Sequence, residues 1–80
     1  MTPAFTKIEG TTFYHVFDGR SRTMRVRFKT MQDGSAIVSK FSMNRNIKLS
    51  EGFMENDAVT KFNSAPTAQK VRTLFKLVER

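Results

Sequence analysis

Apolar and polar residues alternate along the first half of the chain, which is typical of β-strands that bury one face. The alternation is clearest over residues 23–30, where Met24, Val26 and Phe28 are separated by basic side chains. Asp18-Gly19 and Asp33-Gly34 are dipeptides that favour hairpin turns. The pattern predicts strands over residues 12–17, 23–30 and 35–43 and a weaker one over residues 4–9, and it allows a short extra strand over residues 47–49.

The second half of the chain changes to a helical period. We expect Ser50 to cap a short helix whose apolar positions include Met54 and Phe62. Ser64 is expected to cap a terminal helix that has Pro66 in its first turn and ends near Val78. The apolar stripe of this terminal helix consists of Ala68, Val71, Leu74, Phe75 and Val78.

These elements predict an α+β fold. A sheet with one apolar face and a helix with an apolar stripe each need a cover, and each can cover the other. We therefore expect a small two-layer domain over residues 1–80, in which one or two C-terminal helices cover one face of a three- to four-stranded antiparallel meander. The other face of the sheet is expected to be open to solvent.

The amino-acid composition excludes several kinds of covalent and metal site. The chain has no cysteine and a single histidine, His15, so disulfides, thiolate metal sites and a cysteine nucleophile are excluded. We expect neither a metal nor a cofactor. No apolar run is long enough to span a membrane, and the N-terminus lacks the pattern of a signal peptide. We therefore expect a cytoplasmic protein without a membrane partner.

The charge is strongly positive and unevenly distributed. Fourteen Lys and Arg residues stand against seven Asp and Glu residues, for a formal net charge of +7. Residues 20–48 contain eight of the basic residues and one acid, Asp33, so this segment alone has a net charge of 8 − 1 = +7. The eight are Arg20, Arg22, Arg25, Arg27, Lys29, Lys40, Arg45 and Lys48. Such a segment favours a polyanionic partner.

Strand geometry arranges part of this charge in a row. Arg25, Arg27 and Lys29 should point to one side of a single strand, about 7 Å apart. Lys40 is expected to extend the row from the neighbouring strand. Like charges side by side on a sheet destabilise the free fold, and a bound polyanion would offset that repulsion. The alternative is a solvated face that resists aggregation, although such faces normally mix the two signs.

The aromatic segment Phe13–Phe17 allows two registers. We expect Phe13, His15 and Phe17 to point into the core, which leaves Tyr14 on the basic face, where it could stack on a base. In the other register, Phe13, His15 and Phe17 form an exposed stacking platform. That version resembles the aromatic-x-His-x-aromatic strand of cold-shock domains over five residues, but the companion strand of alternating aromatics and glycines is missing, so membership is not predicted.

The predicted function is non-enzymatic binding of nucleic acid, with RNA or single strands favoured over duplex DNA. The predicted site consists of the eight basic residues above together with Tyr14. One alternative is a small inhibitor of an RNA-containing or acidic host protein, because the chain resembles phage accessory proteins in size and general character. A second is a metal-independent ribonuclease that uses Tyr14, His15 and the arginine row, although no acid–base pair is evident. A homodimer formed through open sheet edges is compatible with the pattern.

Overall fold

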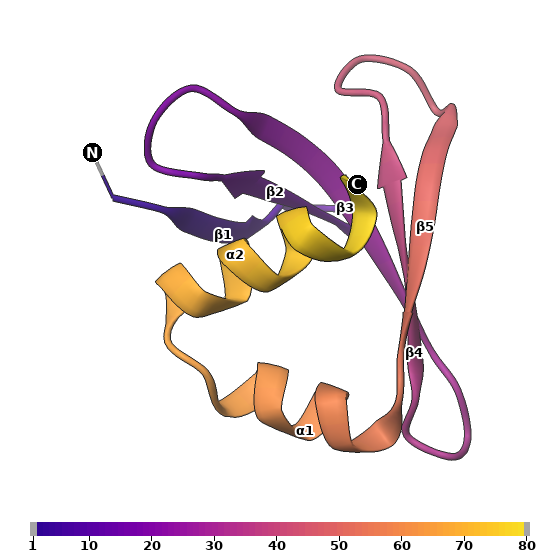
Figure 1. Ribbon diagram of the computed structural model, residues 1–80. Helices are drawn as coiled ribbons and strands as arrows, with labels where there is room; N and C mark the ends of the chain where they lie inside the picture. Colours follow the sequence, from indigo (N-terminus) through magenta and orange to yellow (C-terminus); the bar gives the residue numbers. More distant parts are fainter. Residues whose placement is uncertain (1, 80) are drawn as a thin grey trace.

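The structure, a computed structural model, describes residues 2–79. Five antiparallel strands form one sheet in chain order, and two helices follow them (Figure 1). The elements are β1 (Ala4–Lys7), β2 (Phe13–Phe17), β3 (Thr23–Thr30), β4 (Ala36–Phe41), β5 (Lys48–Met54), α1 (Asn56–Ser64) and α2 (Thr67–Val78). The predicted α+β meander with C-terminal helices on one face is confirmed, with one strand more than expected.

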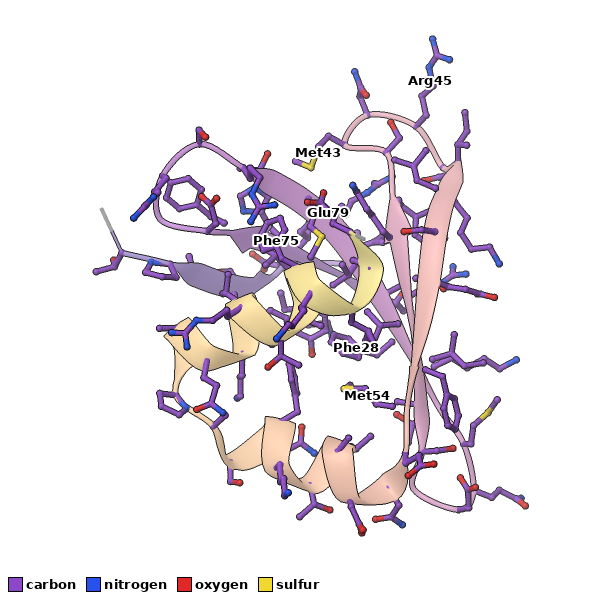
Figure 2. The ribbon with its side chains drawn as sticks, in the orientation of Figure 1. Phe28, Met43, Arg45, Met54, Phe75 and Glu79 are labelled. Carbon is purple, nitrogen blue, oxygen red and sulfur yellow. The ribbon has the colours of Figure 1, made fainter. Side chains whose placement is uncertain are left out.

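The twist of the sheet places the helices in a corner between its two halves. In Figure 1, β1–β3 and β4–β5 lie on two sides of the helices, and α2 contacts β1, β4 and β5. Figure 2 shows Phe28 and Met54 pointing into the space between the sheet and the helices. The buried core consists of Val16, Met24, Val26, Val38, Met54, Phe62, Val71, Leu74, Phe75 and Val78. The apolar stripe predicted for the last helix thus supplies most of the cover.

The fifth strand occupies residues expected to begin a helix. Instead of ending at Leu49, the strand continues through Gly52 to Met54 and pairs with β4 along its length. Ser50 does not cap a helix; its hydroxyl donates a hydrogen bond to the carbonyl of Val78 at 2.6 Å. The alternation that runs from Ser50 to Met54 buries every second residue against the helices, and this burial outweighs the local helical pattern.

The junction between the helices also differs from the prediction. Ser64 is the last residue of α1, and its hydroxyl donates to the carbonyl of Thr60 at 3.1 Å rather than capping the next helix. Pro66 occupies the N-cap position of α2, one residue before the first turn in which it was expected. Proline fits there because it has an extended conformation and no N–H that needs an acceptor.

Gly52 allows α2 to pack closely against β5. A Cβ atom at this position would overlap the Leu77 side chain and lie 3.0 Å from the Leu77 carbonyl oxygen. The glycine is buried, so neither the strand nor the helix can move aside without disturbing the core. The absence of a side chain at Gly52 therefore sets the distance between the sheet and the last turn of α2.

The substitution Gly52→Ala should lower the free energy of unfolding by about 1–3 kcal/mol, because it overpacks this contact. In a Leu77→Ala background the same change should cost less, since the side chain that it meets is gone. Urea unfolding of the two single variants and the double variant measures the coupling. An equal cost of Gly52→Ala in both backgrounds would show that the contact does not limit the packing.

Candidate nucleic-acid interface

The face of the sheet turned away from the helices, which we call the open face, carries both basic and aromatic side chains. Strand register and alternation place its members. On β2–β5 they are Phe13, His15, Phe17, Thr23, Arg25, Arg27, Lys29, Ile37, Ser39, Phe41, Lys48, Glu51 and Phe53, together with Leu49, which a β-bulge leaves without a partner on β4. Glu51 is the one acid among these strand positions, and it pairs with Lys48 at 3.0 Å. The open face is thus cationic along β3.

The three basic residues of β3 share the open face, as the alternation predicts. Arg25 lies opposite Phe41 on β4, Arg27 opposite Ser39, and Lys29 opposite Ile37. On the other side of β3, Arg27 lies opposite Phe13. Arg27 and Lys29 are exposed, whereas Arg25 is half-buried. The row therefore divides into two cations that solvent reaches freely and one that is partly enclosed.

A cluster of two arginines and two phenylalanines forms the centre of the open face. The rings of Phe13 and Phe41 meet edge to face with 5.1 Å between centroids. The guanidinium carbon of Arg25 lies 4.2 Å from the centroid of Phe13, and that of Arg27 lies 4.9 Å from the centroid of Phe41. Cation–π contacts of this kind contribute about 0.5–1 kcal/mol each at exposed sites. They hold the two guanidinium groups close to the sheet surface.

Arg25 connects this cluster to the loop between β4 and β5. Its guanidinium donates hydrogen bonds to the carbonyl of Arg45 and to Oδ1 of Asn46, the latter at 3.3 Å. The loop is also closed by a bond from the Ser42 amide to the Ile47 carbonyl at 3.0 Å. Arg25 therefore positions the loop, and Arg27 and Lys29 are the members of the row that remain available to a ligand.

The structure reverses the expected orientation of the aromatic segment. Phe13, His15 and Phe17 lie on the open face, and Tyr14 points toward the helices. Tyr14 stacks on Phe5, with 4.7 Å between centroids and 10° between planes, and meets Phe28 edge to face at 5.5 Å. The predictions that Phe13, His15 and Phe17 are core residues and that Tyr14 lies on the basic face are therefore wrong.

Lys40 also lies on the opposite face from the one predicted. It shares the helix side with Val38, and its ammonium forms an ion pair with the Glu79 carboxylate at the end of α2. The same carboxylate accepts a bond from Arg22 at 3.2 Å. Arg22 also pairs with Asp18 at 3.2 Å and lies over the ring of Phe75, 4.5 Å from its centroid. Arg22 and Lys40 thus fasten the sheet to α2 instead of extending the row on β3.

The length of the turns explains these errors. A two-residue turn at Asp33-Gly34 would place Lys40 opposite Arg27, but the last bonded pair is Met31 and Ser35, with three residues between them. This one-residue difference places odd-numbered residues of β4 opposite odd-numbered residues of β3. The turn at Asp18-Gly19 is longer in the same way, because Asp18 bonds to Arg22. It places Phe13 and His15, instead of Tyr14, beside the arginines.

The other predicted binding residues lie outside the row. Arg20 is exposed on the turn between β2 and β3, near α2. Arg45 lies on the loop between β4 and β5, and Figure 2 shows its side chain extending away from the protein. Lys48, at the start of β5, is occupied by its ion pair with Glu51. The predicted set therefore separates into the β3 row, the β4–β5 loop and a group beside α2.

Four large apolar side chains are exposed near one edge of the sheet. They come from the β4–β5 loop and the outward side of β5, and between 46% and 57% of their surface is accessible. These residues, which we call the apolar edge, are Met43, Ile47, Leu49 and Phe53. The sequence pattern does not single them out, because residues 50–54 look helical and the outward side of a β-strand is not apparent there.

Comparison with models of protein families, with curated proteins and with solved structures gave no significant match. Across residues 2–79, no three His, Cys, Asp or Glu side chains are grouped in a way that could hold a metal ion. No helix within those residues has both the length and the apolar character needed to cross a membrane.

Asp18 stabilises the turn that sets the β2–β3 register. Its carboxylate accepts hydrogen bonds from the backbone amides of Arg20, Ser21 and Arg22 at 2.8–3.1 Å. The bond from the Arg20 amide, together with those from Arg22 and Ser21, lowers the pKa of Asp18 below its ordinary value of 3.8. A carboxyl with a lowered pKa in the folded state stabilises the fold when it is ionised.

This contribution should be fully present above pH 3.8 and disappear as the pH falls through the lowered pKa of Asp18. Asp18→Asn should therefore be less stable than the native protein at neutral pH, and the difference should shrink in acid. Carboxyl NMR titration together with urea unfolding at several pH values checks both points. A carboxyl midpoint at or above 3.8 for Asp18 would contradict the role assigned to these bonds.

Proposed function

We propose that the open face binds nucleic acid without catalysis, and that it prefers RNA or single strands to duplex DNA. The observation that carries this proposal is the coincidence of exposed cations on β3 with aromatic rings on the flanking strands. Arg27 and Lys29 are exposed, Phe13 lies opposite Arg27 on β2, and Phe17 lies further along β2, opposite Thr23. Cationic grooves interleaved with aromatic faces are the usual means of holding unpaired nucleotides.

The two kinds of side chain have separate roles in this proposal. Arg27 and Lys29 bind phosphates, which positions a strand without specifying its sequence. Arg27 is also held over Phe41, so the outer side of its guanidinium plane can stack on a base. Phe17 and Phe53 can contact bases only where base faces are unpaired and accessible. This requirement favours single strands over a duplex, in which the faces are already stacked.

Arg27→Gln combined with Lys29→Gln should weaken binding to single-stranded RNA and flatten its salt dependence. Loss of two phosphate contacts should reduce the slope of log affinity against log salt by about 1.4, since each contact on a single strand contributes about 0.7. Fluorescence anisotropy with a labelled oligonucleotide at several salt concentrations measures the slope, and duplex DNA of equal length tests the preference.

Lys7→Gln combined with Lys61→Gln is the matched control, because it removes the same charge from exposed positions away from the open face. Thermal unfolding confirms that both variants remain folded. If both double variants flatten the salt slope equally, the protein attracts nucleic acid through its overall charge alone, and the open face is not the binding site.

A second candidate function, binding to an acidic protein, is favoured by the apolar edge. Nucleic-acid binding does not require Met43, Ile47 and Leu49 to be exposed on or next to one loop, whereas grouped exposed apolar side chains commonly mark protein interfaces. Arg45 lies on the β4–β5 loop with Met43 and Ile47, so a partner with an apolar centre and an acidic group near Arg45 would complement this part of the surface. This function corresponds to the inhibitor role considered from the sequence.

Ile47→Ser combined with Leu49→Ser should abolish such a complex and leave RNA affinity within about twofold of the native value, since neither residue carries charge or contacts bases in the first proposal. The measurement is an affinity capture from nuclease-treated host extract, compared with the Arg27→Gln, Lys29→Gln variant. An acidic protein that the serine variant alone fails to capture supports this function. Retention of the same protein by the serine variant would exclude the apolar edge as its binding site.

A further inference from the structure

A second cationic region lies on the helix side of the molecule, in a cleft between the β2–β3 turn and α2. The cleft has a volume of about 710 Å³ and opens to solvent. Its floor is apolar and includes Val71 and Phe75. Figure 2 shows Phe75 and Glu79 on the side of α2 that faces β2 and β3. The charged residues around it are Asp18, Arg20, Arg22, Arg72, Lys76 and Glu79.

Both acids of the cleft are occupied by bonds within the protein. Asp18 accepts bonds from three backbone amides of the turn and from Arg22. Glu79 accepts from Arg22 and from Lys40. Arg22 is therefore shared between the two carboxylates. Arg20, Arg72 and Lys76 are exposed and form no ion pair with any residue in the part of the chain that the structure describes.

The dipole of α2 explains the position of only one of these three cations. Lys76 lies in the last turn of α2, where a positive charge complements the helix dipole. Arg72 lies in the middle of the helix, beyond the reach of that effect, and is one turn from Lys76 on the same face. Like charges at this spacing repel, and Arg20 on the turn adds a third. A bound anion would relieve the repulsion that the fold otherwise tolerates.

Phosphate is the anion that best fits this arrangement. Guanidinium groups bind phosphate oxygens through paired N–H donors, and an ammonium adds a further charge-assisted bond. The cleft volume falls within the range of about 300–1,000 Å³ that is usual for sites that hold a whole small molecule, so there is room for the group that carries the phosphate. The four cations and two acids that line the cleft give it a net charge of +2, which matches the charge of about −1.5 to −2 on a terminal phosphate monoester.

We propose that this cleft binds a phosphate monoester, through Arg20, Arg72 and Lys76, carried either by a free nucleotide or by the end of a nucleic-acid strand. The first source is independent of the proposed function of the open face. The second extends that function, because a strand held on the open face would have its terminal phosphate recognised on the other side of the β2–β3 turn.

Titration with adenosine 5′-monophosphate, followed by amide and guanidinium NMR signals, tests the site, with adenosine as the probe that lacks phosphate. The nucleotide should give saturable shifts at Arg20, Arg72 and Lys76, and adenosine should give none. Arg72→Gln combined with Lys76→Gln should weaken nucleotide binding about tenfold, because each ion pair at an exposed position contributes only a few-fold to affinity. Lys61→Gln combined with Lys70→Gln removes the same charge from helix positions outside the cleft and should leave the affinity unchanged.

A second arm identifies the source of the phosphate. Single-stranded RNA with a 5′-phosphate is compared with the same RNA ending in a hydroxyl. Tighter binding of the phosphorylated strand, lost in the Arg72→Gln, Lys76→Gln variant, assigns the site to strand ends. Nucleotide binding without that preference assigns it to free nucleotides. An equal response to adenosine and to the nucleotide, or equal weakening in both helix variants, would overturn the proposal.

The two proposals fail independently in these experiments. The Arg27→Gln, Lys29→Gln variant should lower the affinity for both forms of the RNA and leave nucleotide binding intact. If this variant binds RNA as tightly as the native protein does, the proposal for the open face is rejected and the proposal for the cleft is unaffected. Conversely, the absence of saturable nucleotide shifts and of a 5′-phosphate preference in the native protein rejects the cleft, whatever the open face binds.

Discussion

The side chains that each face of the sheet presents depend on the number of residues in two turns. Each of the turns at Asp18 and Asp33 leaves three residues between its last bonded pair, and this odd number decides which side chains of β2 and β4 lie beside the arginines of β3. With a turn shorter by one residue, Tyr14 and Lys40 would join the arginines, and Phe13 and Phe41 would face the helices. The aromatic and cationic groups of the open face are therefore brought together by backbone geometry at the two ends of β3.

The same register places the basic residues of segment 20–48 on two faces of the sheet, where they make different contacts. On the open face, Arg25 holds the β4–β5 loop, which leaves Arg27 and Lys29 exposed to solvent. On the helix side, Arg22 and Lys40 meet at Glu79 and fasten α2 to the sheet. A run of positive charge that looks uniform in sequence thus divides into structural cations, which have internal partners, and cations available to a ligand. This division is the basis for treating the open face and the cleft beside α2 as separate sites.

Much of the fold could be predicted from the sequence, because alternation and helical periodicity report burial directly. Val26 and Leu74, for example, are placed in the core by their spacing alone. The extension of β5 through Gly52 could not be predicted. Two of its inward residues, Ser50 and Gly52, are small and not strongly apolar, and the burial of Gly52 depends on its contact with Leu77. The site was predicted only in part: the row on β3 follows from its own alternation, but the side on which Phe13, Tyr14 and Lys40 lie depends on pairing between strands. An Asp-Gly dipeptide indicates a turn without giving its length.

Because Glu79 forms ion pairs with Arg22 and Lys40, the net charge of the protein differs from the positive charge that its surface offers to a ligand. One carboxylate contacts both Arg22 and Lys40, so Glu79 engages two cations while it contributes a single negative charge. A change that removed this carboxyl would raise the formal charge by one, release Lys40 from its ion pair and leave Arg22 paired with Asp18 alone. The net charge would rise by one, whereas the surface beside α2 would gain an unpaired ammonium at Lys40. For this molecule, the pattern of ion pairs describes the charge of its surface better than the excess of lysine and arginine over acids does.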